Sequence, residues 1–278
     1  MFCEDHSAPV VAFQTWFRVG SRHERPGKTG LAHLFEHLMF NESEGFPQGE
    51  YDRLLEEAGA ENNASTWLDW TQYTVAAPAD QLELVVKLEA NRLGRLVVRD
   101  AQVRCEKDVV ANERRFRVDD DVEGTVVETL WATAFQRHPY RWPTIGWMED
   151  IQGFTTEDCV AFYRAHYAPS NAVVVVVGDV TEARLVGLLA EAYGAFPSGE
   201  PVLEDLWPEP PQREERRVEL HQPTVTEKLA VGYHGPALGD ADHAAASVLV
   251  EVLFGGRASR CHQALVRAHE IAIEVRAS

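Results

Sequence analysis

The sequence is poor in basic residues. Of 278 residues, 26 are lysine or arginine and 44 are aspartate or glutamate, which gives a formal net charge of −18. Nucleic-acid binding needs clustered lysine and arginine to contact phosphates, and no basic stripe occurs along this chain, so we expect no nucleic-acid partner. The same charge makes an anionic membrane surface an unfavourable partner.

Long hydrophobic runs and paired cysteines are also lacking. Apolar runs such as 173–177 are far shorter than the roughly 20 residues that span a bilayer, so we expect no membrane insertion. The first residues show no signal peptide, which predicts a cytoplasmic protein, or a periplasmic one if the natural chain begins upstream. No two cysteines form a CxxC pair, and we expect four reduced, mostly buried thiols rather than disulfides or a thiolate zinc site. They are Cys3, Cys105, Cys159 and Cys261.

The remaining composition, with 45% hydrophobic and 25% charged residues, is typical of a soluble globular protein. Apolar periodicity predicts strands and helices without a strict βαβ rhythm, which favours an α+β fold. The predicted strands are 8–19, 64–67, 70–77 and 171–177, the last fully buried. The predicted helices are 31–40, 49–58, 78–98, 100–117 with Asp100 as its cap, 122–135, 156–166 and 181–193.

A proline-rich segment divides the chain. Residues 197–216 contain five prolines and predict a semi-extended linker between a first domain, 1–196, and a second, 217–278. After the linker, predicted strands at 217–220 and 228–233 and a helix at 242–254 repeat the order of the first domain. When residues 32–40 are aligned with 246–254, the apolar positions match, but the polar residues of the first segment are replaced by different ones in the second. We therefore expect an incomplete second homologous domain that lacks the polar motif of the first.

That motif is His33-Leu-Phe-Glu36-His37. Residues four apart share one helix face, so both imidazoles can bind the same ion, and Glu36 flanks it, positioned to take a proton from a bound water. Two imidazoles and one carboxylate leave a position on zinc for that water, as in catalytic sites. The alternative is a chance pattern in a packed core, which would bury three polar groups at a cost of several kcal/mol unless they are satisfied.

A third ligand has two candidates on the predicted helix 100–117. Glu106 and Glu113 are seven residues apart, which places them two turns apart on one helix face. The apolar residues 109–111 give this helix a flank that can pack beside the motif helix. A glutamate on a helix usually faces solvent, so the spacing leaves the role of both residues open.

Together these residues resemble the pitrilysin/insulinase (M16) family of zinc metallopeptidases, the inverse-zincin HxxEH type, particularly its bacterial members and the mitochondrial processing peptidase. Similar segments include 20–24, 30–32, 63–66, 138–140, 167–171, 178–179 and 255–260. The resemblance implies a mixed or antiparallel sheet with helices on one side, in two homologous halves. It also implies one zinc ion per chain, held by His33, His37 and Glu113, with Glu36 as general base and Glu106 as a carboxylate supporting a ligand. The peptide substrate would bind beside the strand that contains Asn63 and Ala64.

In the family, a second half closes the active site and supplies an arginine and a tyrosine that bind the substrate carbonyl. This chain ends at Ser278, before any matching position, so we expect little peptidase activity unless a second homologous half or subunit is present. The predicted function is a zinc-dependent endopeptidase acting on unfolded peptides. The alternative is a non-catalytic scaffold or partner subunit of a two-chain peptidase. A metal-storage module is disfavoured by the single site and the absence of thiolates.

Overall fold

The computed structural model describes residues 1–200 and 207–277, and its contacts divide the chain into two units, Met1–Ala230 and Val231–Ser278. Residues 201–206 of the predicted linker lie outside the described residues. Within the described ranges, no helix is both long and apolar enough to cross a membrane. The predicted domain boundaries stay a prediction.

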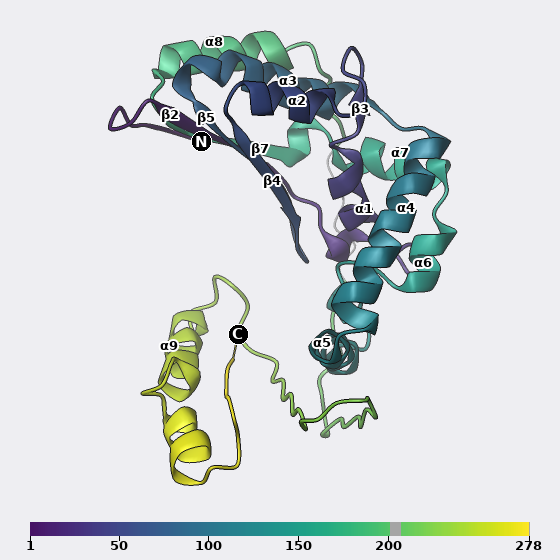
Figure 1. Cartoon of the computed structure of the whole chain (residues 1–278), viewed down its shortest axis with the longest axis vertical. Helices are drawn as coiled ribbons and strands as arrows, with labels where there is room; N and C mark the ends of the chain where they lie inside the picture. The colour runs from purple at the N-terminus through teal and green to yellow at the C-terminus, as the bar shows by residue number, and fades with distance from the viewer. Residues whose placement is uncertain (201–206, 278) are drawn as a thin grey trace. The chain divides into compact units, whose positions relative to one another are not determined.

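A five-stranded sheet organises the first unit (Figure 1). Its order is β1 (Phe2–Glu4), β7 (Ala172–Gly178), β2 (Val10–Phe17), β5 (Thr71–Pro78) and β4 (Glu61–Thr66). The β1–β7 pair is parallel and all the other pairs are antiparallel, so the sheet is mixed, as expected. β1 was not predicted, because its pairing with β7 joins segments more than 170 residues apart.

Helices cover one face of this sheet. Alternation along β2 and β5 buries Val11, Phe13, Phe17, Tyr73 and Val75, while the intervening side chains stay partly accessible. The covering helices include α2 (Glu50–Glu57), α3 (Leu82–Arg95) and α8 (Glu182–Tyr193), which lie over the sheet in Figure 1. This arrangement confirms the expected α+β fold with helices on one side.

The prediction that the strand at 171–177 is fully buried was wrong. Within β7, only Val176 and Gly178 are buried, and Val177 is 40% exposed. The reason is that helices cover only one face of the sheet, so alternate side chains of an apolar strand remain accessible on the other.

A second group of helices packs at the β4 side of the sheet. α1 (Leu31–Leu38) contacts β4, α4 (Asp100–Arg114) and α7 (Thr156–His166). Apolar residues of the three helices are buried in one core cluster. The remaining elements are β3 (Glu42–Ser43) paired with β6 (Leu96–Val97), α5 (Val122–Ala134) and α6 (Met148–Gly153).

Two details of the predicted helix 100–117 need correction. Arg99, not Asp100, occupies the N-cap position, because the Gln102 side chain reaches back to accept the Arg99 backbone N–H. The α-helix ends at Arg114 and continues as a π-helical turn over Arg115–Asp119. Asp121 then caps α5 by accepting the Gly124 backbone N–H.

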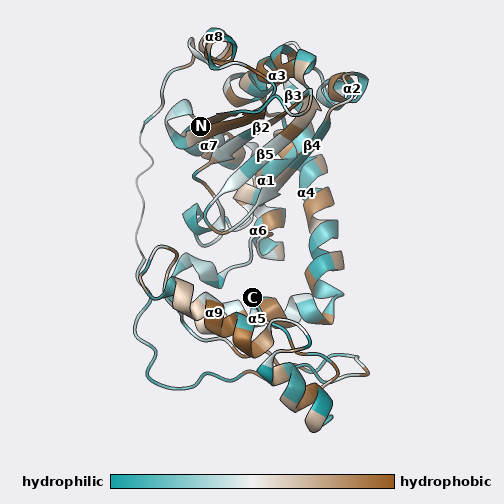
Figure 2. Ribbon diagram, turned by 90° about the vertical axis from the view of Figure 1, so that its left-hand side faces the viewer, coloured by the Kyte–Doolittle hydropathy of each residue, from teal (hydrophilic) through white to brown (hydrophobic). Residues whose placement is uncertain are grey.

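The strands predicted at 217–220 and 228–233 do not form. Within residues 207–277 the structure contains no strand that could pair with them, and a strand needs a partner for its backbone hydrogen bonds. Their apolar side chains, such as Val218 and Leu229, are exposed. The second unit contains the predicted helix, α9 (His243–Phe254), which is mostly apolar (Figure 2), and a π-helical segment, His262–Ala268.

The described part of the linker is held against the first unit. Both oxygens of the Glu209 carboxylate accept backbone N–H groups, from Gln136, Arg137 and His138 at 2.8–3.0 Å. Arg216 donates to the carbonyls of Thr133 and Ala134, at the end of α5. The described residues 207–216 form no helix or strand and are anchored at both of these points.

The four cysteines are free, as expected, but only Cys159 is buried. Cys3 and Cys105 are exposed, since Cys3 lies opposite Val177 on the face of the sheet that the helices leave uncovered, and Cys105 lies on the solvent side of α4.

Candidate metal centre

The N-terminus of helix α1, which carries the HxxEH residues, is fixed by Gly30 and Glu24. Gly30, its N-cap, has φ +95°, and a Cβ there would lie 2.5 Å from the Ile145 carbonyl oxygen, so only glycine fits. The buried Glu24 carboxylate accepts the backbone N–H groups of Gly30 and Ala32 at 2.8 and 2.7 Å. These bonds satisfy two of the orphan donors that every helix start presents.

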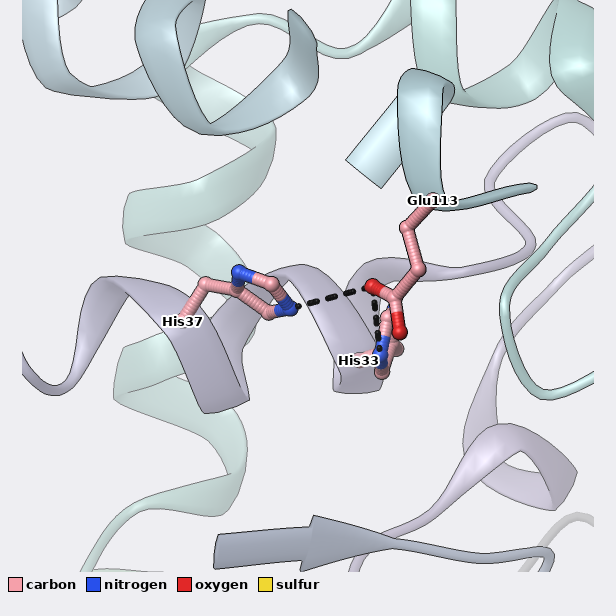
Figure 3. A group of neighbouring side chains, drawn as sticks. All are labelled: His33, His37 and Glu113. Carbon is pink, nitrogen blue, oxygen red and sulfur yellow. Dashed lines mark ion pairs between the residues drawn. The ribbon is translucent and has the colours of Figure 1, made fainter. Parts of the chain in front are cut away.

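The apolar residues of α1 are buried, which sets the direction of the polar ones. Leu31, Leu34, Phe35 and Leu38 belong to the core. His33 and His37 point from the helix toward α4, where Glu113 meets them (Figure 3). Val103 and Val110 of α4 lie in the same core cluster and fix this second helix beside the first.

The structure brings together His33, His37 and Glu113, as the sequence analysis expected. Glu113 Oε2 lies 3.6 Å from His33 Nε2 and 3.5 Å from His37 Nε2, the contacts drawn in Figure 3. One nitrogen of each imidazole and one carboxylate oxygen all lie within 4.8 Å of one another.

This donor set fits a zinc ion. Glu113 Oε2 is buried and has no hydrogen-bond partner among the described residues, and its distances to the imidazoles exceed a normal hydrogen bond. Ligands at roughly 2.0–2.1 Å around a tetrahedral zinc stand about 3.3 Å apart, close to the spacing observed. Imidazole nitrogen with carboxylate oxygen is also a set that zinc accepts.

The pKa values of the two histidines shift in opposite directions. Burial lowers the pKa of His33 to about 4, although Glu113 opposes that shift, so His33 is neutral at pH 7. Burial would also lower the pKa of His37, but the carboxylates of Glu106 and Glu113 outweigh it and raise that pKa to about 9. The same contact with His37 lowers the pKa of Glu113.

Glu106 lies behind His37. Its Oε2 is 3.4 Å from His37 Nδ1, and its Oε1 accepts a hydrogen bond from Asn41 Nδ2 at 3.0 Å. Contact with His37 lowers the pKa of the Glu106 carboxyl, which favours the carboxylate. A carboxylate on Nδ1 leaves Nε2 of His37 facing Glu113, the orientation that a metal ligand requires.

Glu36 lies on the same helix and faces β4. Its Oε2 accepts a hydrogen bond from Thr66 Oγ1 at 2.5 Å. Burial raises the pKa of Glu36, with the Thr66 hydrogen bond opposing. A half-buried carboxylate with a raised pKa is suited to accept a proton near neutral pH.

Asn63 and Ala64 lie in β4, the edge strand next to α1. They line a pocket of about 500 Å³ that also contacts Glu36 and His37. The two predicted substrate residues, the predicted base and one of the three predicted metal ligands therefore border one open space. Glu106 lines it too.

Sequence reasoning missed three residues that support this centre. Asn41 follows His37 by four residues, just beyond the end of α1, and Arg117 follows Glu113 by four, in the π-helical turn after α4. A spacing of four was the signal available for both. Arg117 contacts Glu113 Oε1 at 3.1 Å. Thr66 carried no such signal, because its contact with Glu36 depends on how β4 packs against α1.

Two family models match the chain. The model described as "Insulinase (Peptidase family M16)" matches residues 1–146, and the model described as "Peptidase M16 inactive domain" matches residues 153–278. The first match contains His33, Glu36, His37, Glu106 and Glu113.

Curated relatives and solved structures agree with these matches. A protein named zinc protease PqqE from Helicobacter pylori is 32% identical over 96% of this chain and 61% of its own length. An uncharacterized zinc protease from Mycobacterium leprae is 30% identical over 94% of the chain and 59% of its own length. The crystal structure of a protease from H. pylori superposes with a TM-score of 0.89 at 30% identity, over 97% of this chain and 66% of that one. The chain thus spans about three fifths of the length of the curated relatives it matches.

Proposed function

The chain belongs to the insulinase family, peptidase family M16, and from this premise we propose that it is the metal-binding part of a zinc endopeptidase of the HxxEH type. The observation that carries the proposal is the buried Glu113 Oε2, which accepts no hydrogen bond from the described residues and faces Nε2 of His33 and of His37. The names of the relatives, zinc proteases, support the choice of metal.

In this proposal, His33, His37 and Glu113 hold one zinc ion per chain. When bound, zinc would acidify a water molecule and polarise the carbonyl of the peptide bond. Of the two histidines, Glu106 contacts His37, where its carboxylate would accept a hydrogen bond from Nδ1–H and so keep Nε2 as the ligand atom. His33 already has the neutral form that a ligand needs, because burial lowers its pKa to about 4.

Glu36 would be the general base. Thr66 holds one of its oxygens, so the carboxylate keeps one orientation and its other oxygen can take the proton from the attacking water. After attack, Glu36 would hold that proton and pass it to the leaving amine. Its raised pKa suits both steps, since a base that is too acidic would not retain the proton.

The peptide would bind as an added strand along β4. β4 is an edge strand whose outer side faces no other strand among the described residues. Main-chain hydrogen bonds to the backbone near Asn63 and Ala64 would hold an unfolded peptide without regard to most of its side chains. The scissile bond would then lie near Glu36, which borders the same pocket.

A partner half or subunit forms part of this proposal. The chain matches about three fifths of its zinc-protease relatives, and an Escherichia coli structure at 23% identity is described as the first half of the periplasmic protease PqqL. A second candidate function, a non-catalytic partner subunit, is favoured by one finding. Subunit 1 of the rat cytochrome b-c1 complex is 28% identical over 69% of this chain.

Zinc content measured together with peptide cleavage tests the proposal. The chain would be assayed alone and with an added homologous second half, against a quenched fluorescent peptide. We expect Glu36→Gln to retain zinc and lose about 10²–10⁴-fold in cleavage rate, and Glu113→Gln to lose zinc. Glu56→Gln, an exposed position on α2, is the matched control and should change neither.

The outcomes separate the candidates. Zinc retained in full by Glu113→Gln would contradict the assigned ligand set. If Glu36→Gln cleaved peptide at the rate of the unsubstituted chain, Glu36 would not be the general base. A zinc-loaded chain that cleaves no peptide even with a second half present would favour the partner-subunit function.

A further inference from the structure

Arg114 directly follows the candidate ligand Glu113, and it is buried, with 5% of its surface exposed. A buried arginine is uncommon unless its charge is paired. Its two terminal nitrogens donate to the two carboxylate oxygens of Glu128, at 2.7 and 3.0 Å, in the forked arrangement that guanidinium and carboxylate groups form. Glu128 belongs to α5, which lies at the C-terminal end of α4 (Figure 1). The pair therefore fixes the plane of the guanidinium group.

The same guanidinium group contacts the loop at residues 145–147. Nη1 of Arg114 also donates a hydrogen bond to the Gly146 carbonyl oxygen at 2.8 Å, and the charged group lies 5.6 Å from the centre of the Trp147 ring. A cation over an indole face is attracted to the ring. The carboxylate of Asp119, in the π-helical turn, lies 3.3 Å from Nη2. The side chain next to Glu113 thus ties the end of α4 to this loop.

The other side of the loop contacts the start of α1. Gly146 has φ +87°, and a Cβ there would lie 2.2 Å from the Thr29 carbonyl oxygen and 2.6 Å from the Gly30 Cα. The Trp147 backbone N–H donates to Thr29 Oγ1 at 3.0 Å. Gly30 is the N-cap of α1, three residues before His33. Because packed groups cannot interpenetrate, the position of the loop is transmitted to α1.

Apolar side chains of α1 and α4 also share one core cluster. Apolar burial is non-directional, however, and fixes neither an angle nor a register, whereas a forked hydrogen-bonded pair fixes both. A zinc ligand must place its atom at about 2.0–2.1 Å from the ion, so the centre depends on such a fixed geometry.

We propose that Arg114 is a positioning residue of the metal centre. Held by Glu128 on one side and bonded to Gly146 on the other, it sets the position of Glu113 relative to the two imidazoles. It differs from Glu106 because it contacts no ligand side chain and acts between the two helices that carry the ligands. The inference rests on the proposed function, because it requires that these ligands bind zinc.

The zinc affinity of the full chain, measured by competition with a chelator of known affinity, tests this inference. In Arg114→Lys the charge remains, but an ammonium group cannot form the fork and reach the Gly146 carbonyl from one planar group. We expect zinc to bind about tenfold more weakly, the lower end of the usual effect of residues that support metal ligands. The visible absorption of the Co²⁺-loaded chain should also change, because it reports the coordination geometry.

Two controls separate positioning from general stability. Arg115→Lys changes the next residue, which is exposed and contacts Asn112 Oδ1 at 2.6 Å, and it should leave zinc affinity unchanged. Val180→Ala removes buried volume from a core cluster without any described residue of α1 or α4. It should lower the free energy of unfolding and leave zinc affinity unchanged, because apparent affinity falls only with the fraction of chain that is folded. Urea unfolding gives that fraction for every variant.

Glu128→Gln tests the same link with a milder change. The amide keeps one acceptor oxygen for the guanidinium group and loses the second, so the link is weakened but not removed. We expect zinc to bind about threefold more weakly. When Glu128→Gln is combined with Arg114→Lys, the loss should stay at about tenfold and not reach about thirtyfold, because both substitutions act on one link.

The failures are distinguishable. If the unsubstituted chain binds no zinc, the proposed function is wrong at its metal site, and this inference falls with it. If the unsubstituted chain binds zinc and folded Arg114→Lys binds it equally well, this inference is overturned and the proposed function stands. If Arg114→Lys does not fold, an unchanged zinc affinity in Glu128→Gln overturns the inference in the same way, and a weakened one supports it.

Discussion

The start of α1 offers a sharp test of how the metal centre is held, through Glu24. This buried carboxylate accepts the N–H groups of Gly30 and Ala32 at 2.8 and 2.7 Å. In Glu24→Ala both donors lose their partner inside the protein, where an unsatisfied polar group costs about 1–3 kcal/mol. The two orphaned donors together cost about 2–6 kcal/mol, and loss of the buried charge offsets part of that cost. We therefore expect Glu24→Ala to lower the free energy of unfolding by about 3 kcal/mol.

Glu24→Gln should cost less. The amide retains one acceptor oxygen and loses the second bond, but it also avoids the desolvation of a charge. Burial raises the pKa of Glu24 well above its ordinary value, so the ionised carboxylate itself opposes folding at pH 7. The two effects partly cancel, and we expect a loss of about 1 kcal/mol.

Urea unfolding followed by far-UV circular dichroism measures both values, with Glu56→Gln as the exposed control. The slope with urea should stay constant while the midpoint falls. Since His33 is the third residue of α1, Glu24→Ala should also weaken zinc binding more than the control does. A Glu24→Ala protein within about 0.5 kcal/mol of the unsubstituted chain would refute the reasoning, because that is the usual effect of a surface substitution.

Two further predictions concern His166 and Glu209. Burial lowers the pKa of His166 to about 4. Between pH 6.5 and 4, His166 is therefore protonated in the unfolded chain but neutral in the folded one, so the free energy of unfolding falls as the pH drops toward 4. His166→Phe should remove about 2 kcal/mol of the loss between pH 7 and 5, measured by urea unfolding; an unchanged pH profile would contradict this. Glu209→Ala should speed hydrogen exchange of the amides of 136–138 about tenfold, because their carboxylate acceptor is lost. Equal exchange by mass spectrometry would show that this contact does not hold the linker.

Local pattern and motif were sufficient for most elements of the first unit. The apolar periodicity of 31–40 predicted α1, and the i, i+4 spacing within it placed His33 and His37 on one face. The strand pair β4 and β5 followed from alternation on either side of a short turn. These features are readable because each depends on residues within about ten positions of one another.

Other features depended on contacts between distant segments. β1 exists because it pairs with β7. The strands predicted at 217–220 and 228–233 are absent because residues 207–277 give them no partner. Cys3 and Cys105 were expected to be buried but are exposed. A single sequence does not indicate which face of a sheet or which side of a helix is left uncovered.

For the site, the sequence by itself determined the chemistry available: two imidazoles and a glutamate at the spacing of one helix face. Only the tertiary structure decided which atoms meet. It is the packing of α4 against α1 that places Glu113 Oε2 between the two Nε2 atoms and Glu106 behind His37. It is the packing of β4 that places Thr66 on Glu36. The physical reason is that periodicity sets the direction of a side chain from its own helix, whereas distances between helices depend on core packing over the whole unit.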